Sequence, residues 1–181
     1  MAHIKQFTFL ILITIFFASC SASKSTSVSR KPVVKNQKTA GPQVSAEVPQ
    51  TPVNKVEKVI ETARSFTGTP YRWGGTTRAG MDCSGLVSVA FQAAGISLPR
   101  TSDAQSQYGK KSSLEGLQKG DLVFFASNRA NGKISHVGLV TEVNGKREVK
   151  FIHASTKLGV VENNIYSDYY RKIFVKARRP F

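Results

Sequence analysis

The residue pattern changes near Gly120, and this change constrains the fold more than any other feature of the 181-residue chain. Before it, apolar residues recur at helical spacing. After it come short segments rich in β-branched or aromatic residues, separated by turn residues. Asn144-Gly145, between two such segments, is typical of a β-hairpin. Helices followed by short strands predict an α+β domain of about 130 residues, with N-terminal helices packed on an antiparallel sheet. The expected strands are residues 121–126, 135–143, 148–155, 159–163 and 172–179.

Three helices are expected ahead of the sheet. Apolar residues at helical spacing predict one over residues 53–67. The next is predicted to begin at Cys83 and to end near Gly95, a residue type common just after helices. A short third helix is expected near residue 102, with Thr101 or Ser102 as its cap. Between the first two lies a glycine-rich loop.

The N-terminus has the pattern of an export signal. Lys5 precedes a largely apolar run over residues 7–17, which is too short for a membrane-spanning helix of about 20 residues but fits a secretory signal. The run ends in "FASC", which resembles the lipobox of bacterial lipoproteins and makes Cys20 the expected lipid acceptor. An ordinary cleaved signal with an incidental cysteine is the alternative.

The segment after Cys20 differs in composition from the rest of the chain. It is rich in Ser, Lys, Pro, Gln and Thr and has no aromatic residue, which indicates a disordered tether. The expected organisation is a signal over residues 1–19, a lipidated cysteine and tether over 20–52, and a folded domain over 53–181. A tether of this length would reach roughly 30 Å.

The net charge of +15 predicts an anionic surrounding. Nucleic acid is disfavoured by the export signal, and the single Trp73 with scattered tyrosines offers no row of stacking residues. An acidic polymer or an anionic lipid surface remains.

Cys83 is the candidate nucleophile. A thiol at a helix N-terminus experiences the positive end of the helix dipole, which favours thiolate, and the first amides of the helix can hold a developing oxyanion. The mature chain would keep only two histidines, His136 and His153. They lie on consecutive predicted strands, so one can act on the thiol while the other orients it. A buried structural cysteine is the alternative.

A metal centre is the competing interpretation, since one cysteine and two histidines can bind zinc. The chain lacks paired cysteines and has no HExxH spacing. We therefore expect neither a metal nor an organic cofactor.

Six motifs together resemble the NlpC-type cell-wall cysteine peptidases, which are papain-like in fold. They occur in the family's order, and the resemblance covers residues 53–181. The lipoprotein layout also resembles the Spr-type murein endopeptidases of Gram-negative bacteria. The motifs are "TPYRWGG", "MDCSGLV", "LPRTSDAQ", "GDLVFF", "SHVGLV" and "FIHAS".

The resemblance implies a role for each matching residue. Cys83 matches the nucleophile, His136 the general base and His153 the third polar residue of the triad. Tyr71 matches a tyrosine that lines the site and assists the oxyanion. Trp73 is expected either to form a wall of the cleft or to pack beneath its loop.

Other matches imply contacts with substrate. Asp82 and Ser84 match residues that contact the stem peptide. Arg100 and Ser102 lie in a segment that frames the groove. Asp121, by contrast, matches a structural position.

The implied function is that of a lipid-anchored murein endopeptidase, acting as a monomer on stem peptides that contain diaminopimelate. Ser21 after Cys20 favours the outer membrane, facing the periplasm. The bond cut is either γ-D-glutamyl-diaminopimelate or D-alanyl-diaminopimelate. A non-catalytic murein-binding module and a thiol acyltransferase of the same fold are the alternatives.

Overall fold

The computed structural model describes residues 51–127 and 132–181. The expected signal, Cys20 and all but the last two residues of the expected tether lie outside this part of the chain, so the proposed division into signal, tether and domain stays a prediction. None of the helices in these two ranges has the length and hydrophobicity required to span a bilayer.

The predicted helices are present, and their caps explain where two of them start. The first, α1, begins one residue before the expected boundary, after Thr51, whose side chain accepts a hydrogen bond from the Asn54 amide. Thr101, rather than Ser102, caps α3 by accepting from the Ala104 amide. The helices are α1 (Pro52–Ser65), α2 (Cys83–Gln92), α3 (Ser102–Gln105) and α4 (Asp168–Ile173).

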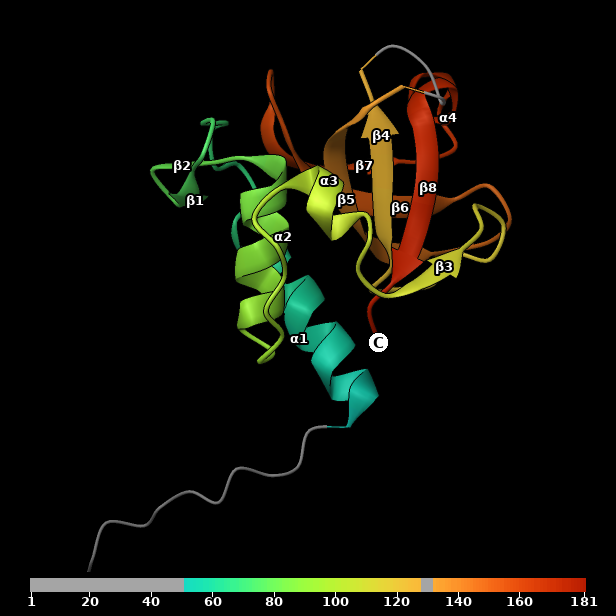
Figure 1. Cartoon of the computed structure of the whole chain (residues 1–181), viewed down its shortest axis with the longest axis horizontal. Helices are drawn as coiled ribbons and strands as arrows, with labels where there is room; N and C mark the ends of the chain where they lie inside the picture. Colours follow the sequence, from blue (N-terminus) through green and yellow to red (C-terminus); the bar gives the residue numbers. More distant parts are fainter. Residues whose placement is uncertain (1–50, 128–131) are drawn as a thin grey trace, which may run out of the picture. The chain divides into compact units, whose positions relative to one another are not determined.

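The strands form a six-stranded antiparallel sheet in the order β3-β8-β4-β5-β6-β7. Helices α1 and α2 cover one face, whereas α4 lies at the opposite side (Figure 1). Two further strands of two residues each, β1 (Thr76–Thr77) and β2 (Gly80–Met81), form a hairpin in the glycine-rich loop before α2. The sheet strands are β3 (Lys110–Ser112), β4 (Leu122–Ala126), β5 (Ile134–Val143), β6 (Val149–Ser155), β7 (Gly159–Asn164) and β8 (Phe174–Arg179).

Some elements were not predicted from the sequence. Residues 172–173, expected to begin a strand, instead end α4. This helix is only six residues long and its cap residue Ser167 makes no side-chain capping bond, so local signals for it are weak. Strand β3 is polar, as suits an edge strand, and pairs only with β8.

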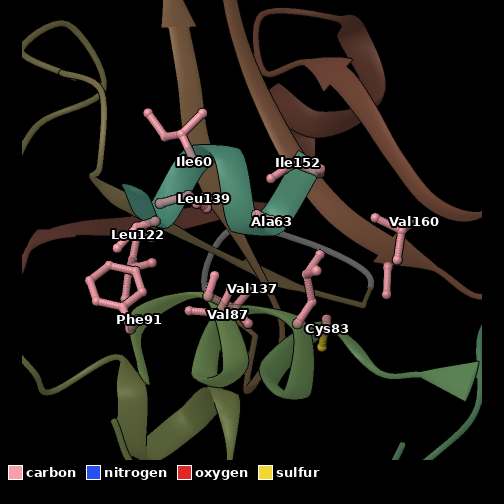
Figure 2. Close-up of a cluster of buried hydrophobic side chains, with 14 of the residues drawn as sticks. Ile60, Ala63, Cys83, Val87, Phe91, Leu122, Val137, Leu139, Ile152 and Val160 are labelled. Atoms are coloured by element: carbon pink, nitrogen blue, oxygen red, sulfur yellow. The ribbon is translucent and has the colours of Figure 1, made fainter. Parts of the chain in front are cut away.

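Alternate residues of the sheet supply two separate cores. On β4, Leu122 and Phe124 face α1 and α2, whereas Val123 and Phe125 face the opposite side. The first core contains Cys83 at the start of α2, among side chains of α1 and of the sheet (Figure 2). The second core consists of Leu117, Val123, Phe125, Val140, Val149, Phe151, Ile165, Ile173 and Ala177.

Gly85 lets the glycine-rich loop lie directly against α2. A Cβ atom at this position would be 2.3 Å from the Gly75 carbonyl oxygen and 3.0 Å from Asp82 Oδ1. The Gly75 carbonyl in turn accepts a hydrogen bond from the Asp82 amide at 3.0 Å. Any larger residue must therefore displace backbone at the start of α2.

Gly85→Ala should destabilise the fold by about 1–3 kcal/mol, the usual cost of overpacking a close contact. Gln92→Ala, at an exposed position of the same helix, is the matched control and should change stability by less than about 0.5 kcal/mol. Urea unfolding followed by circular dichroism measures both. Equal stability of the two variants would show that the loop relaxes without cost.

Candidate active site

Cys83 is the first residue of α2 and is only 7% exposed. Burial is the largest influence on the thiol and raises its pKa. Hydrogen bonds from the amides of Val137, Ser84 and Cys83 itself act in the opposite direction. The sequence-based expectation that a helix start favours thiolate therefore meets a stronger opposing effect, because desolvation disfavours the charged form. The resting side chain is a thiol that needs a base.

The carboxylate of Asp82 holds the start of α2 in place. Oδ1 accepts from the Gly85 amide at 2.6 Å, and Oδ2 accepts from the Gly74 amide at 2.8 Å. Arg100 donates to both oxygens, at 3.0 and 2.7 Å. Although burial opposes it, this set of donors lowers the pKa of Asp82 below its ordinary value. Asp82 thus links the loop, the helix cap and the segment before α3.

Ser84 belongs to the same network, and Ser102 does not. The Ser84 hydroxyl lies 3.2 Å from Asp82 Oδ1 and accepts from Arg100 at 2.9 Å. No side-chain hydrogen bond of Ser102 is present in the described part of the chain. The expected contacts of Asp82, Ser84, Arg100 and Ser102 with substrate stay predictions, and the first three have polar atoms already engaged within the protein.

His136 and His153 come together as expected. They lie on the paired strands β5 and β6, and His136 Nε2 is 2.8 Å from His153 Nδ1. The two rings are nearly perpendicular, with an interplanar angle of 89°. His136 immediately precedes Val137, which belongs to the same buried cluster as Cys83. Strand β5 therefore contributes both to the core around the thiol and to the histidine pair.

Both imidazoles are held in the neutral form. Burial, with a smaller contribution from His153, lowers the pKa of His136 to about 3. Burial also lowers the pKa of His153, against the opposing hydrogen bond to Asn163. Since each folded-state pKa lies below the ordinary value of about 6.5, both rings take up a proton only at a lower pH than an ordinary imidazole does. A neutral His136 is able to accept a proton.

Two residues that were not predicted from the sequence complete this polar group. Asn163 on β7 places Oδ1 at 2.9 Å from His153 Nε2. The hydroxyl of Tyr170 on α4 lies 3.1 Å from the same nitrogen and donates to Asn163 Oδ1 at 3.0 Å. Period-two alternation puts Asn163 on the face that carries Phe151 and His153, so a signal for Asn163 existed in the strand pattern. None existed for Tyr170.

The histidines open onto a cleft of about 550 Å³. Tyr71 and Trp73 line it from the glycine-rich loop, and Tyr169 and Tyr170 line it from α4. Trp73 is 86% exposed, so it is a wall of the cleft and does not pack beneath its loop. The remaining lining residues are Ala126, Ser127, Ser135, His136, His153, Ser155, Thr156, Lys157 and Ile173.

Cys83 is buried and is not among the residues that line this cleft. Within residues 51–127 and 132–181, no hydrogen bond joins its thiol to a histidine ring. Catalytic hydrogen bonds are often long in the absence of substrate, and Cys83 shares its buried cluster with Val137 of β5. Tyr71 is close enough that the Cys83 charge contributes, after burial, to raising the Tyr71 pKa. In the same two ranges, no group of three His, Cys, Asp or Glu residues is placed to hold a metal ion.

Comparison with known proteins identifies the family. The profile of the NlpC/P60 family matches residues 68–179, which include Cys83, both histidines and the loop before α2. The chain belongs to the NlpC/P60 family. The sequence-based expectations of an α+β papain-like fold and of a cysteine peptidase of this family are thereby confirmed.

Two curated relatives match over most of their length. A probable endopeptidase of Haemophilus influenzae is 39% identical over 130 residues, covering 71% of this chain and 76% of that protein. The Escherichia coli K12 protein named Murein DD-endopeptidase MepS/Murein LD-carboxypeptidase is 32% identical over 175 residues, covering 93% of this chain and 88% of that protein.

Solved structures agree on the fold. An NlpC/P60 family protein from Bacillus cereus superimposes with a TM-score of 0.63 at 34% identity, and the match covers 68% of this chain but only 39% of that one. The peptidoglycan hydrolase RipB from Mycobacterium tuberculosis gives a TM-score of 0.59 at 29% identity, covering 79% of this chain and 73% of that one.

Alkylation of Cys83 by iodoacetamide should accelerate steadily as the pH rises, because the thiol has a raised pKa and His136 a lowered one. The measurement belongs in the Cys20→Ala background, with the urea-unfolded chain as the reference. The folded protein should react more slowly than the unfolded one near neutral pH. A fast plateau from about pH 5 upward would instead demonstrate a resting thiolate–imidazolium pair.

Proposed function

We propose that this protein is a peptidoglycan endopeptidase that hydrolyses an amide bond in murein peptides through Cys83. One observation carries the proposal: the buried Cys83 thiol belongs to the same core cluster as Val137, the residue after a neutral histidine that is paired with a second one. The name of the Escherichia relative, a murein DD-endopeptidase, supports the substrate class, and the name of the Haemophilus relative, a probable endopeptidase, supports the type of reaction. The basic chain suits a polymer whose peptides carry carboxylates.

The proposed reaction has two halves. His136 takes the Cys83 proton as the sulfur attacks the amide carbon, and amides at the start of α2, assisted by Tyr71, receive the oxyanion. The C–N bond then breaks, and the His136 imidazolium gives its proton to the leaving amine. Water, deprotonated by His136, attacks the resulting thioester, the C–S bond breaks, and the imidazolium returns a proton to the thiolate.

Two kinds of bond are candidates within murein. The Escherichia relative, which matches across 93% of this chain, has DD-endopeptidase in its name. The γ-D-glutamyl-L-lysine dipeptidyl-peptidase of Bacillus subtilis matches over only 46% of this chain. The D-alanyl bond of a cross-link is therefore the first bond to test, and the γ-D-glutamyl bond is the second.

Cys83→Ala should reduce release of soluble muropeptides by about 10³-fold or more, the scale seen when a nucleophile is removed from a peptidase. Cys20→Ala is the matched control, and it should retain turnover of soluble muropeptides. Mass spectrometry of the products identifies the bond cut. Substantial hydrolysis by the Cys83→Ala protein would refute the mechanism. An aminolysed product in place of a hydrolysed one would indicate an acyltransferase.

We further propose that the protein is anchored to a bacterial envelope membrane, facing the periplasm, by lipid on Cys20. The support lies in the sequence: an apolar run of secretory length that ends in "FASC". The tether that the composition of the segment after Cys20 predicts would let the site reach the polymer from the membrane.

If Cys20 carries the lipid, Cys20→Ala should move the protein from the membrane fraction to the soluble fraction. It should also abolish incorporation of a fatty-acid probe. Cys83→Ala serves as the control and should leave both unchanged. Membrane retention of the Cys20→Ala protein would show that the basic surface or an uncleaved signal attaches the protein to the membrane.

A further inference from the structure

The hydrogen-bonded cluster of His136, His153, Asn163 and Tyr170 has only one arrangement of protons that leaves His136 able to act as a base. Asn163 presents its carbonyl oxygen, Oδ1, to His153 Nε2. A carbonyl oxygen accepts but cannot donate, so the proton between these atoms belongs to the imidazole. A neutral imidazole carries a single N–H, and His153 Nδ1 is then a bare acceptor.

The same reasoning continues to the next ring. Because His153 Nδ1 has no proton, the 2.8 Å contact with His136 Nε2 requires the N–H to lie on His136. A neutral His136 is thereby left with an unprotonated Nδ1, which is the nitrogen free to take the thiol proton. The arrangement also suits the imidazolium, since His136 Nε2–H still donates to His153 after Nδ1 is protonated.

A reversed Asn163 amide would move the proton of each histidine to the other ring nitrogen. Its NH₂ group would face His153 Nε2 and force the N–H of His153 onto Nδ1. His136 Nε2 would then have to accept, and the only N–H of neutral His136 would occupy Nδ1. Such a ring has no lone pair available for the thiol.

The geometry points to Asn163 as the residue that sets the tautomers of both histidines, with Tyr170 holding its amide oxygen in place. Both are positioning residues, because they act through His153 and not on substrate. Tyr170 donates to Asn163 Oδ1, and its ring packs edge-on against Phe151 at a centroid distance of 4.8 Å. This assignment rests on the proposed role of His136 as the base.

The surroundings of His153 favour a neutral acceptor. His153 is 2% exposed and stacks on Phe151 with ring centroids 4.9 Å apart. The titratable groups that face it are His136 from β5 and Tyr170 from α4; Tyr169 packs on Tyr170, and Lys157 lines the same cleft. Burial raises the pKa of Tyr170 to about 12, so its hydroxyl stays a donor in the working range. An anion in place of Asn163 would draw a second proton onto His153.

Histidine tautomers are directly observable by ¹⁵N NMR of the imidazole nitrogens. The full chain has three histidines, so single His→Gln variants assign the signals. We expect both His136 and His153 to carry their proton on Nε2 near neutral pH. A His153 protonated on Nδ1 would overturn the inference. No murein substrate is needed, so the result stands whether or not the proposed hydrolysis is confirmed.

Kinetics of two Asn163 variants test the consequence. Asn163→Leu should lower kcat by about 10- to 100-fold, the usual effect of losing such an outer partner, with little change in KM. Asn163→Asp keeps the shape, and its carboxylate should raise the pKa of His153. The acid limb of the kcat–pH profile of the Asn163→Asp variant should therefore move to higher pH, and its activity should recover in alkaline solution. Tyr170→Phe should lower kcat less than Asn163→Leu does.

Asn164 on the same strand provides the matched control. It accepts from the Tyr166 amide at 3.0 Å and donates to the Arg147 carbonyl at 3.0 Å, so its contacts are with backbone. Asn164→Leu should reduce thermal stability and leave the pH profile and histidine tautomers unchanged. If Asn163→Leu and Asn163→Asp also leave the tautomers and the pH profile unchanged, Asn163 is a packing residue and the inference is wrong.

Discussion

The start of α2 is buried against β5, and the polar groups gathered there have to find partners within the protein. Unpaired buried amides and charges are costly, so the Asp82 carboxylate accepts from Gly85 and Gly74 and is neutralised by Arg100. The buried amide of Gln105 donates to the Ser84 carbonyl at 3.1 Å and connects α3 to the same turn. Hydrogen bonds and an ion pair at the start of α2 thus hold the loop, the helix cap and α3 together.

The same burial determines the chemistry of the thiol. In an exposed position, the dipole and first amides of α2 would favour thiolate, but desolvation dominates and keeps Cys83 protonated. Thiolate, not thiol, is the form that oxidants attack. A resting thiol beside neutral imidazoles is therefore protected in the oxidising compartment that we propose for this protein. Proton transfer to His136 becomes favourable only as the sulfur bonds to carbon, which confines reactivity to the bound substrate.

Local sequence patterns predicted most of the helices and strands. They predicted less where tertiary contacts determine the structure. Helical and alternating periodicity predicted α1, α2 and strands β4 to β8, and the hairpin between β5 and β6 placed His136 near His153. Strand β3 and helix α4 were missed because short polar or tyrosine-rich segments lack periodicity. Thiolate stabilisation at Cys83 was overestimated because a sequence pattern shows a helix terminus but not the depth at which it is buried. The role of Tyr170 could not be predicted for a related reason, since only the packing of α4 on the sheet directs its hydroxyl to Asn163.

Antiparallel pairing explains how residues from three strands form one ordered chain of hydrogen bonds. Alternate side chains of β5, β6 and β7 share a face, so His136, His153 and Asn163 can follow one another across the sheet. Gly138 makes room beneath them, because a Cβ atom there would be 2.4 Å from Phe151 Cδ2. The Phe151 ring then lies flat against His153 and excludes water from one side of it. An imidazole between an aromatic ring and an amide oxygen has few alternative partners for its proton, and the apolar floor of the site thereby helps to specify the tautomer on which the base depends.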